Sequence, residues 1–370
     1  MNREDLIYTY LSVLSIKGVS HTSIFNIYKH FGTLANIFKV EPRYLLESGL
    51  TQSQVEMIAQ KQIDVNFVEK EISLIKKYRI EITLLEDEDY PDLLKQINDP
   101  PALIYTIGDK TVLKKPSIGI VGSRRASNKG KEFARKLASD LAEVGFNIIS
   151  GFATGIDIYA HMGALEKGST VAVFGNGLLN VYPAHHKKFL PEIYKNGCIL
   201  SELPLMEMPN AHNFPKRNRI ITGLSLGVVV VEAAKKSGSL ITAQLAVEYG
   251  RDLFAVPAWP ADTNSGTNTL LKEGAKLVES YLDVIEEYSH ILNISKFIDK
   301  NDNNTIINKD GNYAKIIDIL MAGPATIDEI CLKSGKSASD ILAIITNMEL
   351  EDIIYMGSDG KYSLNRRING

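Results

Sequence analysis

The run Gly227-Val228-Val229-Val230-Val231 is the feature that most constrains the fold of this chain. A run of β-branched residues without polar alternation predicts a strand covered on both faces, as in a parallel sheet flanked by helices. Just before it, Phe214-Pro215-Lys216-Arg217-Asn218-Arg219 carries three cations in four positions behind an aromatic residue, and leads into the apolar segment 220–225. The sequence therefore predicts a short basic segment that is directly followed by the buried core of an α/β domain.

This strand belongs to a longer alternating series. Segments 118–121, 147–149, 171–174, 199–200 and 253–256 have strand character, and helical patterns at 129–143, 156–166 and 240–249 alternate with them. Strands and helices alternating at this spacing predict a doubly wound parallel sheet. In the connector before the series, residues 80–85 have strand character and residues 103–105 are predicted to form an edge strand.

Two further domains are expected on either side. Residues 1–75 contain short helices separated by Gly-containing turns, the pattern of a helix-hairpin-helix or SAM-like domain; a small helical packing module is an equal alternative. Residues 76–288 would hold the α/β domain, and the polar segment 289–311 a flexible linker. Residues 312–370 carry three helices and a hairpin, which is the pattern of a winged helix. Its second helix is expected to begin with a capping box of Thr326 and Glu329.

Composition limits how such a chain could bind nucleic acid. The 370 residues carry a net charge of -3, so there is no global positive field and any such binding must come from a local patch. Cys198 and Cys331 lie far apart and are expected to be free thiols of a reducing compartment. The N-terminal segment does not resemble a signal peptide, and no apolar run reaches membrane-spanning length. We therefore expect a cytoplasmic protein without a membrane partner.

Three turns are predicted to meet at one edge of the sheet. They are Gly122-Ser123-Arg124-Arg125, Ser150-Gly151 and Ser237-Gly238-Ser239, and each lies between a strand and a helix. The carboxyl ends of parallel strands share one edge, where ligands bind, and helix N-termini there offer backbone amides to anions. Together with the basic segment, the turns predict a groove lined by phosphate-binding groups. A basic segment alone is more often a solvated helix face.

Cofactor and metal sites are not supported by the motifs. The first turn lacks Gly-x-Gly-x-x-Gly, no acidic residue ends the second strand, and there is no Walker motif, so no nucleotide cofactor is predicted. Asp157 and His161 stand four residues apart on a predicted helix, but no cysteine or second ligand pair accompanies them, so no metal site is predicted either. We expect Asp157 to cap or tighten its helix and His161 to pack or contact ligand. Glu232 is the one carboxylate placed to act on a ribosyl bond, although holding the basic segment or a loop amide is its favoured role.

The ordered motifs of residues 90–280 resemble the DNA-processing protein A (DprA, also called Smf) family of bacteria. The motifs are Ile120-Val121-Gly122-Ser123-Arg124, Ser150-Gly151, Gly155-Ile156-Asp157, Ala160-His161, Tyr182-Pro183, Ser201-Glu202, Phe214 to Ile221, Val231-Glu232-Ala233, Ser237 to Ala243, and Phe254-Ala255-Val256-Pro257. The resemblance implies an extended Rossmann-like domain that binds single-stranded DNA without sequence specificity, forms a homodimer and loads the RecA recombinase during natural transformation.

Carried over residue by residue, the resemblance implies a DNA-binding site without a catalytic residue, cofactor or metal. Its members would be Gly122, Ser123, Arg124, Arg125, Gly151, Phe214, Lys216, Arg217, Asn218, Arg219, Ser237, Gly238 and Ser239. The chain departs from the family pattern at Thr154 and Ala184, where cations are common, and at Ala258, where glycine is usual. The two missing cations would weaken phosphate contacts.

Two other functions fit the same residues. A Rossmann-like nucleotide hydrolase could use Glu232 and Arg219 on a ribosyl bond, although the Gly-Gly-x-Gly-Thr loop of such enzymes is absent. A scaffold protein could recruit a partner through its winged helix. There Lys361, Arg366 and Arg367 could touch duplex DNA, whereas the acidic neighbours of the hairpin favour protein contact.

Overall fold

The computed structural model divides into two compact units, Met1–Leu292 and Asn293–Gly370. The residues that it describes are 2–234, 237–260, 262–288, 315–317, 319–320, 323–350, 353–357 and 360–364. The predicted linker at 289–311 and the cations Arg366 and Arg367 lie outside these residues. The predicted domain boundaries remain predictions.

Within the described residues, the first unit is built on a nine-stranded sheet of order β1-β2-β6-β5-β4-β3-β7-β8-β9. Across the sheet, all neighbouring strands in the segment β6-β5-β4-β3-β7-β8-β9 are parallel. Strand β2, by contrast, pairs antiparallel with both β1 and β6. The strands are β1 Glu81–Leu84, β2 Leu103–Gly108, β3 Ser117–Val121, β4 Asn147–Ser150, β5 Thr170–Val173, β6 Gly197–Ser201, β7 Gly227–Val230, β8 Asp252–Ala255 and β9 Lys276–Leu277.

Residues 103–105 are not at the edge of this sheet, so that prediction is wrong. Leu84 of β1 lies opposite Leu103 of β2, and β1 therefore supplies the outer strand. The connector sequence showed both apolar segments but not that they pair with each other. The run at 227–230, by contrast, is a fully buried central strand, as its β-branched sequence predicts.

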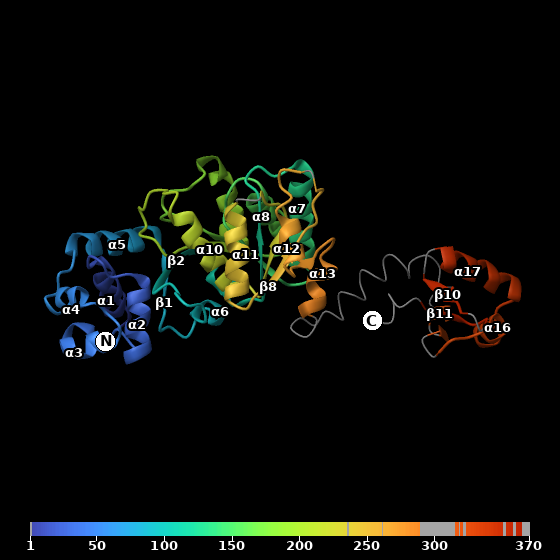
Figure 1. Ribbon diagram of the computed structural model, residues 1–370, viewed down its shortest axis with the longest axis horizontal. Coiled ribbons are helices and arrows are strands. Elements are labelled where there is room, and N and C mark those ends of the chain that lie inside the picture. The colour runs from blue at the N-terminus through green and yellow to red at the C-terminus, as the bar shows by residue number, and fades with distance from the viewer. Residues whose placement is uncertain are drawn as a thin grey trace. The chain divides into compact units, whose positions relative to one another are not determined.

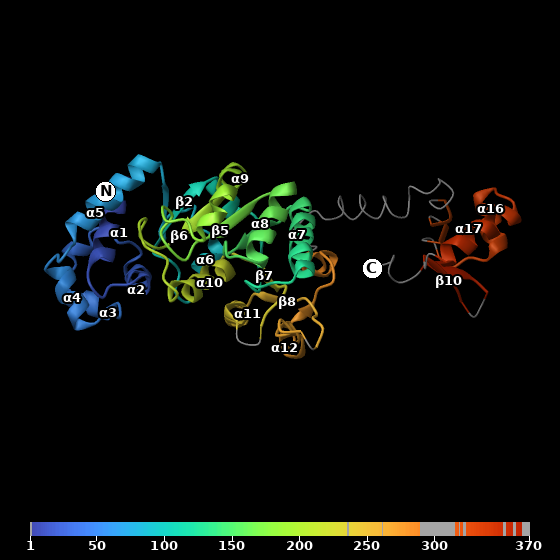
Figure 2. The same cartoon turned by 90° about the horizontal axis from the view of Figure 1, so that it is seen from above.

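Helices cover both faces of the sheet (Figures 1 and 2). Figure 2 shows α8 and α9 on one side of the strands and α10 and α11 on the other. The helices of this region are α6 Asp92–Lys95, α7 Asn128–Glu143, α8 Ile156–Lys167, α9 Leu190–Asn196, α10 Asn213–Gly223, α11 Gly238–Glu248, α12 Thr267–Lys272 and α13 Leu282–Ile285, with the 3-10 turns η2 Lys110–Lys114, η3 Ala184–Phe189 and η4 Glu286–Tyr288. The basic segment is thus the first half of α10.

The N-terminal residues form short helices, as their pattern predicts. They are α1 Arg3–Ser15, α2 His21–Phe31, η1 Ile37–Lys39, α3 Pro42–Glu47, α4 Gln52–Ala59 and α5 Val65–Tyr78. In the first Gly-containing turn, the Ser20 side chain already accepts a hydrogen bond from the Ser23 amide and caps α2. The apolar faces of these helices share one buried cluster with strands β1, β2 and β6. These contacts favour the packing role for the helical domain.

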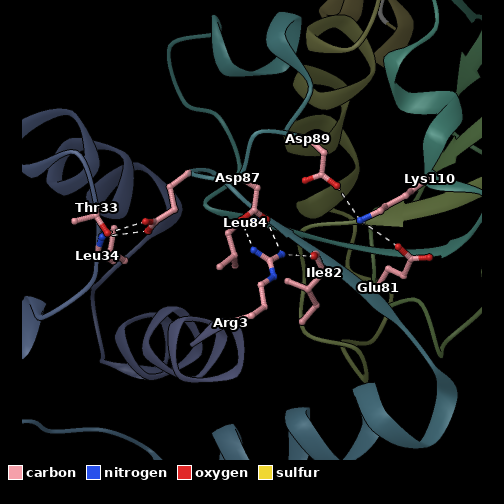
Figure 3. A network of polar contacts seen from close by, with 10 residues as sticks. Arg3, Thr33, Leu34, Glu81, Ile82, Leu84, Asp87, Asp89 and Lys110 are labelled. Carbon is pink, nitrogen blue, oxygen red and sulfur yellow. Dashed lines mark hydrogen bonds and ion pairs between the residues drawn. The ribbon is translucent and has the colours of Figure 1, made fainter. Parts of the chain in front are cut away.

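Polar contacts fasten this helical domain to the loop that follows β1 (Figure 3). The Arg3 guanidinium forms a two-pronged ion pair with the Asp87 carboxylate and also donates to the backbone oxygen of Ile82 at 2.9 Å. Beside it, Glu86 accepts a hydrogen bond from the Thr33 hydroxyl at 2.6 Å. The acidic run after β1 therefore joins the helical domain to the sheet.

The second unit has the helices and hairpin of a winged helix. Its described elements are α16 Ile327–Ser334, α17 Ala338–Leu350, β10 Ile354–Met356 and β11 Tyr362–Leu364, with residues 315–317 and 319–320 also helical. The capping box of Thr326 and Glu329 forms as predicted, and β10 pairs antiparallel with β11. The unit has an apolar core of its own.

In neither unit do the described residues include a helix with both the length and the apolar character needed to cross a bilayer.

Candidate nucleic-acid interface

A cavity of about 760 Å³ opens at the carboxyl ends of the parallel strands. Its walls come from the loops after β3, β4, β5, β6, β7 and β8 and from α10 and α11, which lie far apart in the sequence. The predicted site residues that line it are Gly122, Ser123, Arg124, Arg125, Phe214, Arg217, Asn218, Ser237, Gly238 and Ser239. Gly151, Lys216 and Arg219 do not line it.

A cation and two aromatic rings stand together in the cavity wall. The exposed Arg124 guanidinium lies 5.3 Å from the centre of the Phe214 ring, and the Tyr182 ring lies 5.5 Å from the same ring. Tyr182 remains 44% exposed, and Arg124 forms no ion pair with any described residue. Tyr182 is not among the site residues predicted from the sequence, although its Tyr-Pro motif is a usable signal. A cation beside exposed rings can hold a phosphate while a base stacks.

The turn that carries Arg124 is held from both sides. The Ser123 amide donates to the Glu232 carbonyl at 2.7 Å, and the Ser123 carbonyl accepts from the Ile156 amide at 3.3 Å. Gly122 is required by space, because a Cβ there would lie 2.6 Å from the Ile156 side chain and 3.0 Å from the Glu232 carbonyl. The first turn therefore presents its arginines from a fixed backbone.

Arg217 serves as an internal support in the floor of the cavity. It is only 4% exposed, and its guanidinium donates to the carbonyl oxygens of Gly151, at 2.7 Å, and Val173. The Asp157 carboxylate accepts from the amides of Gly151 at 3.1 Å and Ala153 at 3.3 Å. Burial lowers the pKa of Arg217 to about 10, opposed by Asp157, so the guanidinium stays charged at neutral pH. Burial likewise raises the pKa of Asp157, and Arg217 opposes that shift.

The backbone groups of Gly151, predicted to bind phosphate, are instead bonded to side chains of the protein. Its amide is bound to Asp157 and its carbonyl to Arg217. A Cβ at this position would lie 2.5 Å from the Arg217 guanidinium and 2.7 Å from the Asp157 carboxylate. Glycine is needed here because the backbone passes between two buried charged groups. Asp157 thus tightens the start of its helix, as expected.

Arg219 and Lys216 lie outside the cavity for different reasons. The Arg219 guanidinium is buried in ion pairs with Glu202 at 2.6 Å and Asp99 at 2.9 Å. Because these carboxylates already neutralise its charge, the ion pairs favour an internal role for Arg219 over the predicted contact with DNA. Lys216 is exposed on the turn of α10 between Phe214 and Arg217, beside the cavity and not in its wall.

The N-terminus of α11 forms another wall. The hydroxyls of Ser237 and Ser239 lie 2.6 Å apart, and the Asn218 amide group of α10 donates to the Gly238 carbonyl at 3.3 Å. A Cβ on Gly238 would meet no atom within 4 Å, so space does not demand glycine there. The positive end of the α11 dipole adds to the cavity's attraction for anions.

Glu232 is placed as a structural group. Its carboxylate accepts hydrogen bonds from the Ser127 amide at 2.9 Å and from the Asn264 side chain at 3.0 Å, and so holds two loops together. Neither Glu232 nor Arg219, the two residues assigned to the hydrolase alternative, lines the cavity. The described residues contain no cluster of His, Cys, Asp and Glu able to hold a metal ion.

Comparison with known proteins identifies the family. The family model for DNA recombination-mediator protein A matches residues 81–289, more than half of the chain, and the model for the DprA winged helix domain matches residues 303–355. The chain belongs to the DNA recombination-mediator protein A family. The predicted family and fold class are thereby confirmed.

Three relatives show how far the likeness extends. DNA processing protein DprA of Bacillus subtilis is 38% identical over 68% of this chain and 88% of its own. The crystal structure of DprA from Streptococcus pneumoniae matches with a TM-score of 0.67 at 36% identity, over 75% of this chain and 97% of that one. A structure of DprA from Helicobacter pylori, described in terms of its single-stranded DNA binding mode, matches with a TM-score of 0.53 at 34% identity, over 58% of this chain and 99% of that one.

Proposed function

We propose that this protein binds single-stranded DNA without sequence specificity, protects it and loads the RecA recombinase onto it during natural transformation. The observation that carries the proposal is the Arg124 guanidinium, without an ion-pair partner among the described residues, lying over Phe214 in the cavity wall. The binding of single-stranded DNA by the related Helicobacter pylori protein supports it.

The proposed contacts account for the lack of sequence specificity. Arg124, Arg125 and Lys216 would neutralise phosphates, and the N-terminus of α11 would hold phosphate oxygens. Phe214 and Tyr182 would each stack a base, worth roughly 1–3 kcal/mol per base. Phosphates and the faces of bases are common to all sequences, so these contacts do not discriminate among them.

The proposal includes a homodimer and a RecA contact and assigns no catalytic residue, metal or cofactor. Sedimentation equilibrium of the full chain tests the dimer, and RecA filament assembly on single-stranded DNA, with and without the protein, tests the loading. A sedimenting mass of one chain at all concentrations would remove the dimer from the proposal, and unchanged filament assembly would remove the loading.

The central test is fluorescence anisotropy of a labelled oligo-dT and of a duplex of equal length, across a salt series. We expect tight binding of the single strand that weakens steeply with salt, because phosphate contacts release counterions. Arg124→Glu and Lys216→Glu should each weaken it. Lys195→Glu is the matched control, because this exposed lysine at the end of α9 makes the same charge change at the opposite ends of the strands.

Equal binding of the duplex, or an equal effect of all three variants, would overturn the site assignment. Release of free base from nucleoside monophosphates by the purified protein would favour the hydrolase instead.

A further inference from the structure

Trp259 is the only tryptophan of the chain, and it is 74% exposed on the loop that follows β8. The backbone on which it sits is fixed. The Asn268 side chain bonds both the amide and the carbonyl of Ala258, at 3.0 and 2.7 Å, and the Asp262 amide donates to the Trp259 carbonyl at 2.9 Å. A large ring is therefore presented to solvent from a backbone held by these hydrogen bonds, and a ligand that covered the ring would meet a low entropic cost.

The same loop continues into the wall of the cavity. Thr263 and Asn264 line the cavity, and the Asn264 side chain donates to the Arg125 carbonyl at 3.3 Å as well as to Glu232. The loop that carries Trp259 is thus tied to the turn that carries the exposed arginines. The loop with the ring and the turn with these cations therefore lie at the same carboxyl edge of the sheet.

Aromatic rings consequently flank the arginines on both sides. In the strand order, Tyr182 follows β5, Arg124 and Arg125 follow β3, and Trp259 follows β8. Four strand intervals separate β5 from β8, which is roughly 19 Å at about 4.8 Å per interval. Cations with interspersed aromatic rings are the arrangement that binds an extended single strand.

We propose that Trp259 stacks on a base of the same DNA strand, forming a second stacking site beyond the cavity. The inference rests on the proposed function and extends its site along the sheet edge. The carboxylate of Asp262 is in the same turn, so this site holds a base by its face and leaves the phosphates to Arg124 and Arg125. The ligand at Trp259 is a nucleobase of any identity, because every base has a face that can stack.

Because the chain has a single tryptophan, its emission reports on this residue alone. We expect titration of the full chain with oligo-dT to change the tryptophan emission in parallel with the anisotropy of the labelled strand. An oligomer of abasic sites with the same number of phosphates should leave the emission near its starting value. Trp259→Ala should weaken dT binding about 5- to 150-fold, the range that one stacked base gives, and Trp259→Phe should retain most of the affinity.

A series of oligo-dT strands of different length makes the test more specific. The difference between the wild type and Trp259→Ala should disappear for oligomers too short to reach from the cavity to the loop. The melting temperature of Trp259→Ala should equal that of the wild type, because the ring is exposed, so a loss of affinity would not reflect unfolding.

The outcomes separate this inference from the proposed function. If dT binds by anisotropy but the emission stays constant and Trp259→Ala binds as tightly as the wild type, the second stacking site is overturned and the proposed function stands. If dT does not bind at all, both fall. If Trp259→Ala alters the sedimenting mass of the free protein without altering its affinity per chain, the ring belongs to an interface between copies and the inference is again overturned.

Discussion

The contact between the helical domain and β1 differs from the cavity in how its charges are neutralised. At the contact, Arg3 is paired with Asp87, and nearby Lys110 is held between Asp89 at 2.9 Å and Glu81 at 3.2 Å (Figure 3). At the cavity, the Arg124 guanidinium faces an aromatic ring. Paired charges fix two parts of the protein to each other, whereas a cation without a carboxylate partner remains available to an anion from outside.

The same difference recurs within two turns of α10. Lys216 is exposed, Arg217 is buried against backbone carbonyls, and Arg219 is buried against carboxylates. Three neighbouring cations thus have three different roles. Their environments, and not their shared charge, determine which of them can bind DNA.

The largest effect is expected for Arg217→Met. The substitution removes the bonds to the Gly151 and Val173 carbonyls and leaves Asp157 buried without its nearby cation. A buried polar group left without its hydrogen-bond partner costs about 1–3 kcal/mol, and the substitution leaves two carbonyl oxygens in that state. Urea unfolding followed by circular dichroism would measure it, with Lys216→Met as the control expected to stay within about 0.5 kcal/mol. Equal unfolding midpoints for the two variants would show that Arg217 is not a support.

A pH effect should come from His161, which lies under the Gly151 turn. Its Nδ1 is 2.7 Å from the Thr170 hydroxyl, and that hydroxyl donates to the Ile148 carbonyl, so Nδ1 carries the proton. Its Nε2 has no hydrogen-bond partner among the described residues. Burial, with smaller contributions from His186 and Arg217, lowers the pKa of His161 to about 3 from the ordinary 6.5.

The unfolded chain therefore takes up this proton as the pH falls below 6.5, and the folded chain does not until about pH 3. The contribution to stability is complete above pH 6.5 and decreases as the pH falls, by about 2 kcal/mol between pH 7 and pH 5. Urea unfolding at both pH values should show a smaller decrease for His161→Gln than for the wild type. The same decrease in both proteins would assign the pH dependence to other groups.

At the cavity, Arg124→Gln should alter binding and not stability. Loss of one phosphate contact should weaken dT binding by about 1 kcal/mol and reduce the slope of log K against log salt by about 0.7. Its unfolding midpoint should match that of the wild type. Arg219→Gln should do the reverse, because it leaves Glu202 buried without its cation. An altered salt slope for Arg219→Gln, with unchanged stability, would reverse the roles assigned to the two arginines.

The smallest effect is expected for Arg3→Gln at the helical-domain contact. The Arg3 side chain is 47% exposed, and solvent screening on that side keeps the contribution of the ion pair to about 1 kcal/mol. The melting temperature should decrease only slightly, and the affinity for oligo-dT should not change. A loss of DNA binding in this variant would mean that the two regions are coupled.

Local sequence predicted those parts of the structure that local chemistry determines. The β-branched run at 227–230 and the capping box of Thr326 and Glu329 each depend on a few neighbouring residues. The burial of Arg217 depends on a carbonyl 66 positions away, and that of Arg219 on Glu202 and Asp99 in other segments. Such partners are brought together only by the folded sheet, so neither the basic pattern of the segment nor its resemblance to the family motif indicated that these two arginines are buried.

The bonds of Arg217 also have a consequence for how this family could vary. The Arg217 guanidinium joins α10 to the ends of β4 and β5. Natural selection would therefore act on mutations at that position mainly through their effect on folding. Folding does not depend in this way on the exposed positions Arg124, Lys216 and Trp259. Substitutions there can therefore alter the strength of ligand binding while the fold stays intact. Among homologues, differences in affinity should accumulate at these exposed positions, with the buried arginine held constant beneath them.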